Sequence, residues 1–311
     1  MSPPTLLFAT EAYCELQRLI ASDRVQQGVI ERDSFPDGER YLRLVTPVRG
    51  RRVAVLGGTI DDTATLELFD LASAAVVEGA SAVTLLIPYF GYSTMERQQK
   101  PGEVVTAKLR AHLISALARP ADGLQVVLLD LHAPGLPYYF EADVRPVHIT
   151  PTRLLCEAIR NCAGDEDFVV GAVDAGAAKR VQNLANELGV EAGFVFKRRL
   201  SGDQVSFTAL AADVRGKRVV LCDDMVRTGG SLIQGARAYL EAGATSVAAV
   251  ATHGVLPPGA LDRLERSGVL DCLVVTDSHP NALAQRGGFL RVVTIAGVLE
   301  RWLQRDQEKE P

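Results

Sequence analysis

The chain has neither the basic surplus of a nucleic-acid-binding protein nor a hydrophobic run long enough to cross a membrane. Its 311 residues include 33 Lys and Arg against 38 Asp and Glu, a formal net charge of −5. Proteins that bind phosphate backbones usually carry a positive surplus, so we expect no nucleic-acid partner. Nowhere do roughly eighteen apolar residues follow one another, and MSPPTLLFATEAYC has no basic stretch leading into an apolar segment. We expect a cytoplasmic protein without membrane contact.

Cysteine is sparse and scattered along the chain. The five cysteines are Cys14, Cys156, Cys162, Cys222 and Cys272. This odd set without a C-x-x-C pair indicates neither a disulfide framework nor a zinc site. We interpret the five as small apolar residues.

Short apolar runs alternate with periodic segments of helix length. RVAVLG at 52–57 is followed by TLELFDLASAAVVEGA at 65–80 and then by AVTLLIPYF at 82–90. Strands that are apolar throughout and joined by helices are typical of a parallel sheet covered on both faces. The pattern predicts an α/β fold, and the length allows two domains.

The second half of the chain repeats the first. VRGRRVAVL at 48–56 matches VRGKRVVLC at 214–222, and EGASAVTLLIPYFG at 78–91 matches AGATSVAAVATHG at 242–254. Near-identical strings with matched flanks favour duplication over coincidence. We expect two tandem domains, 1–147 and 148–311, each with a parallel sheet flanked by helices. The C-terminal helix is expected to pack back on the first domain.

The two copies differ where a binding site is expected. The second copy reads RVVLCDDMVRTGGSL, while the first has GGTIDDTAT in place of the acids and the glycine turn. Ligands of open parallel sheets bind beyond the carboxyl ends of strands, and we expect 223–231 to form such a strand-to-helix loop. Glycine N–H groups at a helix start suit a phosphate, and ionised carboxylates suit vicinal hydroxyls. The pattern predicts a ribose 5-phosphate site; the simpler alternative is a turn with a helix N-cap. The residues expected to form the site are Asp223, Asp224, Arg227, Thr228, Gly229, Gly230 and Ser231.

VVLCDDMVRTGGS resembles the phosphoribosyl-pyrophosphate (PRPP) motif shared by phosphoribosyltransferases and PRPP synthetases. Further segments resemble only the synthetases, the ribose-phosphate pyrophosphokinases: FPDGERYLRL, VVLLDLHAPGLPYYF, VDAGAAKRVQNLANELG and FKRRLSGDQV. They follow the family's order and cover nearly the whole chain. The resemblance implies two phosphoribosyltransferase-like domains. It also implies an enzyme that transfers the β,γ-diphosphoryl group of Mg-ATP to the C1 hydroxyl of ribose 5-phosphate, giving PRPP and AMP.

The resemblance assigns catalytic and metal roles to four residues. Lys197 and Arg199, in a loop-like basic stretch, match the family's mobile catalytic loop, where their charges stabilise the transferring group. His132 and Asp174 are implied contacts of Mg²⁺, which binds largely through substrate phosphates and water. By themselves these features are equally typical of a solvated charge run, a structural histidine and a helix N-cap. No general base is identifiable.

The resemblance also implies residues that bind ATP. They are Phe35, Asp37, Gly38 and Glu39, which hold the base across a subunit interface, and Arg97, Gln98 and His132. A homo-oligomer, a dimer or a hexamer, is therefore expected, although FPDGE is equally a hairpin turn. The loop TMERQQKPGEVVTA is closer to plant-type members, which leaves the nucleotide donor open. Arg227 stands where the family usually has an acid.

Three other functions compete with this interpretation. A non-catalytic paralogue that regulates true synthetases is one, but the intact Lys197, Arg199 and His132 argue against it. A phosphoribosyltransferase that consumes PRPP would share the acid pair but not FPDGE, DLHA or the duplicated first domain. A diphosphotransferase acting on another sugar phosphate stays open.

Overall fold

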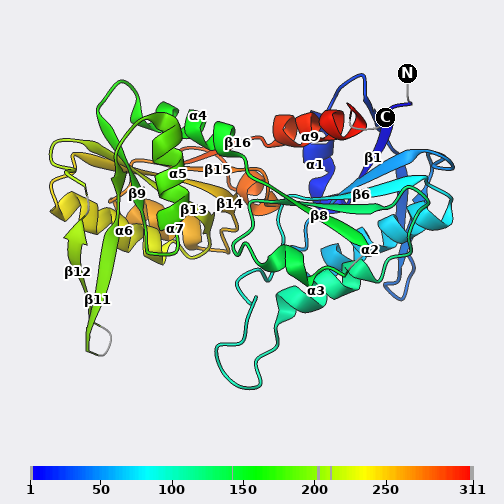
Figure 1. The fold of residues 1–311 in the computed structure, drawn as a ribbon, viewed down its shortest axis with the longest axis horizontal. Helices are drawn as coiled ribbons and strands as arrows, with labels where there is room; N and C mark the ends of the chain where they lie inside the picture. Colours follow the sequence, from blue (N-terminus) through cyan, green and yellow to red (C-terminus); the bar gives the residue numbers. More distant parts are fainter. Residues whose placement is uncertain (1–2, 142, 202–203, 211, 309–311) are drawn as a thin grey trace. The chain divides into compact units, whose positions relative to one another are not determined.

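The protein forms two compact units in a computed structural model (Figure 1). The structure describes residues 3–141, 143–201, 204–210 and 212–308, and leaves the side chains of 195–211 and 306–308 outside that description. Unit 1 comprises Met1–Thr150 with Ala296–Pro311, and unit 2 comprises Pro151–Ile295.

Unit 1 is built on a six-stranded sheet in the order β2-β1-β5-β6-β7-β8, with all neighbours parallel. The strands are β1 (Thr5–Ala9), β2 (Val25–Gln27), β5 (Arg52–Leu56), β6 (Ala82–Ile87), β7 (Leu124–Leu129) and β8 (Val144–Ile149). The helices are α1 (Cys14–Leu19), α2 (Asp62–Val77), α3 (Thr106–Ser115) and α9 (Ala296–Glu308), with 3₁₀ turns at Glu11–Tyr13 and Leu136–Tyr139. Helix α9 lies against α1.

Unit 2 has a sheet of the same design, in the order β10-β9-β13-β14-β15-β16 and again parallel throughout. Its strands are β9 (Phe168–Ala172), β10 (Ala192–Gly193), β13 (Arg218–Val226), β14 (Ser246–Gly254), β15 (Leu273–Thr276) and β16 (Leu290–Val293). Its helices are α4 (Thr152–Ala163), α5 (Ala178–Leu188), α6 (Gly230–Glu241), α7 (Ala260–Arg266) and α8 (Pro280–Ala284).

Each unit also carries one antiparallel hairpin, inserted after its second strand. In unit 1 it is β3 (Ile30–Ser34) with β4 (Arg40–Leu44), and in unit 2 it is β11 (Val195–Ser201) with β12 (Gln204–Leu210). The strand order and the hairpin position therefore coincide in the two halves. The predicted α/β class and the internal duplication are confirmed.

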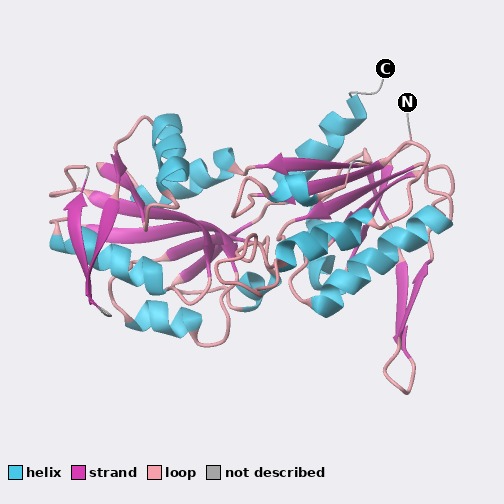
Figure 2. Ribbon diagram, turned by 60° about the horizontal axis from the view of Figure 1, so that its bottom comes forward, coloured by secondary structure: helices cyan, strands magenta, loops and turns pink. Residues whose placement is uncertain are grey.

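The predicted apolar runs are the strands of the two sheets. Helices cover both faces of each sheet (Figure 2). All six residues of β6 are buried, as are Val219–Cys222 in β13. A strand with two buried faces needs apolar residues at successive positions, so these runs show no alternation with polar residues. Within the described part of the chain, no helix is long and apolar enough to span a membrane.

The basic stretch around Lys197 departs from its predicted loop character. Its backbone is strand β11, paired antiparallel with β12 through Lys197 and Phe207, Arg198 and Ser206, and Arg199 and Val205. The hairpin projects from the sheet of unit 2 in Figure 1. The alternating apolar residues of QVSFTAL supply the partner strand, and this long-range pairing is not visible in the basic residues themselves. The side chains of Lys197 and Arg199 lie outside the described residues.

Candidate functional site

The carboxyl ends of β9 and β13 bring Asp174, the predicted Mg²⁺ contact, close to Asp223 of the predicted sugar-phosphate site. These strands are direct neighbours in the sheet, and the chain order reverses between them, which is where open α/β sheets bind ligands. Asp174 follows β9, and its Oδ1 accepts hydrogen bonds from the backbone N–H groups of Gly176 (2.9 Å) and Ala177 (3.2 Å). The loop is folded around this carboxylate, which is held at the edge of the sheet.

The acid pair lies inside strand β13 and not in the loop that follows it. The prediction that 223–231 form a loop is therefore wrong for its first four residues. Asp223, Met225 and Val226 align with Ala251, His253 and Gly254 of β14, and this pairing extends the strand to nine residues. The backbone N–H of Asp224 donates to Oδ1 of Asp223 at 2.9 Å. Asp224 is buried, whereas Asp223 is partly exposed to solvent.

Three carboxylates share this edge, and their environment changes the protonation of Asp223. Burial raises the pKa of Asp223, and the neighbouring Asp224 raises it further, with a smaller contribution from Asp174. Burial disfavours the charged form of a carboxyl group, and nearby like charge has the same effect. A ligand that brings hydroxyl donors or a cation relieves this repulsion. The site is therefore matched to a polyol or a metal-bound phosphate.

We expect Asp223→Asn to make the folded protein more stable at alkaline pH. The pKa of Asp223 is raised in the folded state, so the folded protein binds more protons than the unfolded chain above the ordinary carboxyl pKa. The free energy of unfolding consequently falls as pH rises toward the raised value. Asn keeps the Oδ1 acceptor without the charge. Because it removes a poorly compensated buried charge, we expect it to raise the free energy of unfolding at alkaline pH by about 1–3 kcal/mol. Urea unfolding at pH 5 and pH 9 measures the effect. A variant with the same pH dependence as the wild type contradicts the account.

The glycine turn directly precedes a three-turn helix. Gly229 is the N-cap of α6 and has a φ of 74°, a left-handed conformation that favours glycine. Arg227, Thr228 and Ser231 are exposed beside it. The first backbone N–H groups of a helix lack intrahelical partners and carry the positive end of the helix dipole. The turn and the helix start therefore have the backbone geometry that the predicted anion site requires.

Helix α7 supports this turn from behind and adds a residue that sequence reasoning missed. A Cβ on Gly229 would lie 2.5 Å from Cγ of Leu264, so a larger residue cannot be accommodated there. Nη2 of Arg263 lies 3.8 Å from where a Cβ of Gly230 would be. A guanidinium at that distance adds positive charge to the phosphate cradle. In the sequence, Arg263 is recognisable only as a basic residue shortly after Gly259, the N-cap of α7.

The corresponding point of unit 1 is closed by side chains. A Cβ on Gly57 would lie 2.7 Å from Cγ2 of Thr10, and one on Gly58 would lie 2.2 Å from the hydroxyl oxygen of Tyr13. Thr10 and Tyr13 are both buried. Unit 1 therefore has no room for side chains at the positions that correspond to Asp223 and Asp224. This agrees with the difference between the two sequence copies.

The residues predicted to hold the nucleotide base form a tight turn in unit 1. The N–H of Gly38 donates to the carbonyl of Phe35 (2.9 Å), and the N–H of Phe35 donates to the carbonyl of Glu39 (2.8 Å). Gly38 has a φ of 92°, and Oδ1 of Asp37 accepts the N–H of Glu39 at 3.1 Å. The Phe35 ring is 52% exposed. The turn presents an aromatic face and two carboxylates at the tip of the β3–β4 hairpin.

The other predicted nucleotide contacts lie at a different place in unit 1, the carboxyl edge of β6 and β7. Arg97 and Gln98 are exposed in the loop after β6, where Nε2 of Gln98 donates to the carbonyl of Glu103 at 2.7 Å. His132 is exposed after β7. Asp130 precedes it with a φ of 46°, which is uncommon for a residue other than glycine and often marks a functional site. Arg97 and Gln98 thus belong to the loop after β6 and His132 to the loop after β7, whereas the hairpin turn belongs to a separate two-stranded sheet.

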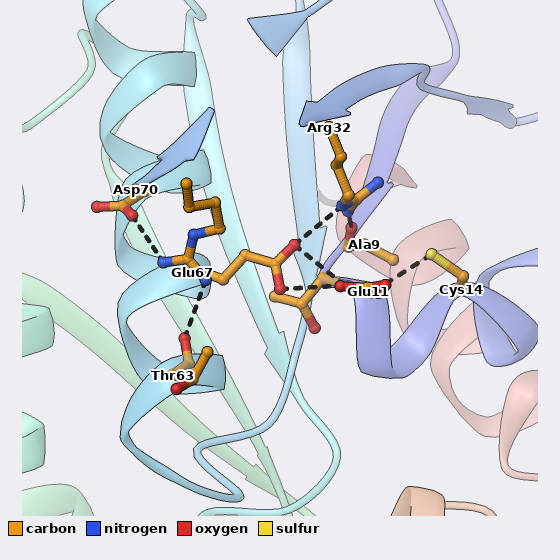
Figure 3. A network of polar contacts seen from close by, with 9 residues as sticks. Ala9, Glu11, Cys14, Arg32, Thr63, Glu67 and Asp70 are labelled. Carbon is orange, nitrogen blue, oxygen red and sulfur yellow. Dashed lines mark hydrogen bonds and ion pairs between the residues drawn. The ribbon is translucent and has the colours of Figure 1, made fainter. Parts of the chain in front are cut away.

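A buried ion pair anchors the base of that hairpin (Figure 3). Glu67 of α2 is 6% exposed and accepts from Nε of Arg32 on β3 at 3.1 Å. Its two oxygens also accept the backbone N–H of Glu11 at 3.1 and 3.2 Å, and Nη2 of Arg32 donates to the carbonyl of Ala9 at 2.5 Å. One carboxylate thus joins the hairpin to α2 and to the end of β1.

Loss of this charge is expected to destabilise unit 1. In Glu67→Gln the guanidinium of Arg32 keeps its position but loses its counter-charge, a change that costs about 1–3 kcal/mol at a buried site. Glu31→Gln is the matched control on the same hairpin, because Glu31 and its partner Arg43 are half-exposed and exposed pairs contribute little. Thermal unfolding of both variants measures the difference. Equal melting temperatures would argue against the anchoring role.

These two units and the cradle in the second define a tandem phosphoribosyltransferase-like protein. Residues 5–117 match the model for the N-terminal domain of ribose phosphate pyrophosphokinase, and residues 147–276 match the phosphoribosyl transferase domain. The ribose-phosphate pyrophosphokinase of Methanopyrus kandleri is 35% identical over 89% of this chain and 93% of its own length. The chain belongs to the ribose-phosphate pyrophosphokinase family.

Further relatives agree with this assignment. The ribose-phosphate pyrophosphokinase of Fusobacterium nucleatum is 34% identical over 96% of this chain and 94% of its own. The crystal structure of phosphoribosylpyrophosphate synthetase from Mycobacterium smegmatis superposes with a TM-score of 0.86 at 29% identity, covering 98% of this chain and 100% of that one. The family and the enzyme class predicted from the sequence are confirmed.

Proposed function

We propose that this chain transfers the β,γ-diphosphoryl group of ATP to the C1 hydroxyl of ribose 5-phosphate, giving PRPP and AMP. The observation that carries the proposal is the cradle of unit 2, where two carboxylates and a glycine-capped helix end meet at one sheet edge. A carboxylate pair accepts from vicinal hydroxyls, and a helix start binds a phosphate. The family relationship supplies the reaction that such a sugar phosphate undergoes.

Each residue of the cradle has a defined part in this proposal. Asp223 and Asp224 accept hydrogen bonds from the 2- and 3-hydroxyls of ribose, which orients the C1 hydroxyl. The 5-phosphate binds the backbone of 227–231 and the hydroxyls of Thr228 and Ser231, with Arg263 adding positive charge. Lys197 and Arg199 stabilise the charge on the transferring group, because phosphoryl chemistry depends mainly on positioning and electrostatics.

The nucleotide binds through unit 1 in this proposal. The Phe35 ring and the carboxylates of Asp37 and Glu39 hold the base and ribose, while Arg97, Gln98 and His132 contact the phosphates. An exposed aromatic ring beside acceptors suits a purine base with an amino group. A turn at the tip of a projecting hairpin is also suited to reach a second subunit. We therefore propose a homo-oligomer, a dimer or a hexamer, in the cytoplasm.

Asp174 and His132 are the residues proposed to contact Mg²⁺. Among the residues that the structure describes, no cluster of three or more His, Cys, Asp or Glu side chains could hold a metal by itself. The Asp174 carboxylate, oriented by two backbone N–H groups, still fits a magnesium ion that arrives with the nucleotide. When bound, the metal neutralises charge on the phosphate oxygens.

An assay of the purified protein with ribose 5-phosphate, Mg²⁺ and ATP tests the proposal. We expect AMP and PRPP in equal amounts, and no AMP when the sugar phosphate is left out. Other sugar phosphates and other nucleoside triphosphates, with and without inorganic phosphate, define the acceptor and the donor. No AMP with any donor would favour a non-catalytic regulatory paralogue. AMP formed only with a different sugar phosphate would overturn the assigned acceptor.

A further inference from the structure

Two cysteines far apart in the sequence meet at the end of unit 2 opposite the cradle. Cys162 lies near the end of α4, and Cys272 directly precedes β15; α4 and β15 are labelled in Figure 1. Both line a cavity of about 280 Å³, together with Arg218, Arg291 and Asp271. The two side chains are 6% and 5% exposed, respectively, and both thiols are free. Their shared place in the lining of this cavity brings two side chains together that are about 110 positions apart in the sequence.

The cavity is open to small solutes and is lined by charges of both signs. Arg218 and Arg291 lie in it with the acids Asp165, Glu166 and Asp271, and the exposed Arg291 and Asp271 show that the lining reaches the surface. Arg218 pairs with Asp271 at 2.5 Å through Nη2. Within the described part of the chain its Nε is buried without a hydrogen-bond partner, which leaves one donor unused. A thiolate beside these guanidinium groups is stabilised.

The two thiols differ in acidity. Contact with the Cys162 thiol, followed by the charges of Arg291 and Arg218, lowers the pKa of Cys272, although burial opposes the shift. The same contact, with burial, raises the pKa of Cys162. A dithiol whose members have one lowered and one raised pKa has the arrangement of an attacking and a resolving cysteine.

We propose that Cys162 and Cys272 form a peroxide-sensitive dithiol that closes to a disulfide. The Cys272 thiolate attacks one oxygen of a hydroperoxide, so that an S–O bond forms, the O–O bond breaks and the released oxygen leaves as water or alcohol after taking a proton. The Cys162 sulfur then attacks the sulfenic sulfur, an S–S bond forms, the S–O bond breaks and water leaves. Both sulfurs are oxidised together by two electrons, and the peroxide is reduced.

The dithiol is separate from the proposed sugar site. Arg218 is the first residue of β13, whereas Asp223 and Asp224 lie toward the other end of the same strand. A disulfide here would tie α4 to β15 and close a loop of roughly 110 residues. Closing so long a loop restricts the unfolded chain, so the oxidised protein is expected to melt at a higher temperature than the reduced one.

The test treats the reduced full-length protein with hydrogen peroxide in increasing amounts, followed by alkylation of the remaining thiols. The expected product has lost two hydrogen atoms and leaves Cys14, Cys156 and Cys222 alkylated. Digestion is expected to yield one linked peptide pair that contains Cys162 and Cys272, and dithiothreitol is expected to reverse the change. This measurement needs no variant. Peroxide that produces no such pair, or that oxidises Cys156 as readily, overturns the proposal.

Serine variants assign the roles of the two sulfurs. In Cys162→Ser the sulfenic acid at Cys272 has no resolving thiol, so dimedone is expected to label Cys272. Cys272→Ser is expected to leave Cys162 unlabelled, and Cys156→Ser, on the same helix α4, is expected to form the disulfide as the wild type does. Circular dichroism verifies that each variant is folded. Dimedone labelling of Cys162 in Cys272→Ser at the wild-type rate contradicts the assignment.

Discussion

We expect Lys197→Ala to lose about 10²–10³-fold in turnover while its affinity for ribose 5-phosphate stays within about twofold of the wild type. The proposed role of the ammonium group is to stabilise charge that develops on the transferring diphosphoryl group. An interaction made mainly in the transition state lowers kcat without weakening substrate binding. Steady-state kinetics with saturating ATP, together with calorimetric titration of the sugar phosphate, measures both quantities.

Arg198→Ala is the matched control for this experiment. It removes one positive charge from the adjacent position of the same strand β11 and is expected to retain turnover near the wild-type value. The comparison separates a specific role of Lys197 from the general positive potential of the hairpin. Weakened binding of the sugar phosphate with normal turnover at saturation would refute the proposed role. Equal losses of turnover in both variants would show that Lys197 contributes only to the general positive potential of the hairpin.

The second large effect is expected at Gly229. In Gly229→Ala the new Cβ would occupy the place of the Leu264 side chain, at 2.5 Å from its Cγ, and φ would be held at 74°. Left-handed backbone costs a residue with a Cβ about 1–2 kcal/mol, and overpacking a core contact costs about 1–3 kcal/mol more. The turn would shift, and its N–H groups would no longer converge on one phosphate. We expect the affinity for ribose 5-phosphate to fall at least about tenfold, which corresponds to about 1.4 kcal/mol.

Gly259→Ala separates the two causes of that effect. Gly259 caps the neighbouring helix α7 with a φ of 79°, and a Cβ there would have no atom within 4 Å. It therefore imposes the backbone strain without the clash. We expect a lower melting temperature in both variants, but weaker binding of the sugar phosphate only in Gly229→Ala. Unchanged binding in Gly229→Ala, measured by calorimetry, would show that the turn does not hold the phosphate.

The architecture was accessible from the sequence because it depends on local and repeated signals. Strands buried on both faces leave uninterrupted apolar runs such as AVTLLI, and two copies of the VRG-led strand expose the duplication. The acid pair was predicted to lie in the loop after its strand, but the strand extends to Val226. That extension depends on pairing with β14, a long-range contact that apolar patterning does not encode at Asp223 and Asp224.

The sequence contained less information about features created by tertiary contact. Cys162 and Cys272 lie far apart in the sequence, so spacing rules for cysteine pairs do not detect their meeting. Arg263 reaches the cradle only because α7 packs behind Gly229. The Glu67 carboxylate resembles any acid on a helix until two other segments, at Glu11 and Arg32, converge on it. In each case the relevant distance follows from the fold and not from the local residue pattern.

A crystal structure of the protein soaked with ribose 5-phosphate tests the central claim most directly. We expect electron density for the phosphate on the backbone of 228–231 at the start of α6, and the 2- and 3-hydroxyls within hydrogen-bonding distance of Asp223 and Asp224. Density for the sugar elsewhere, with the turn at Gly229 unoccupied at saturating concentration, would contradict the account.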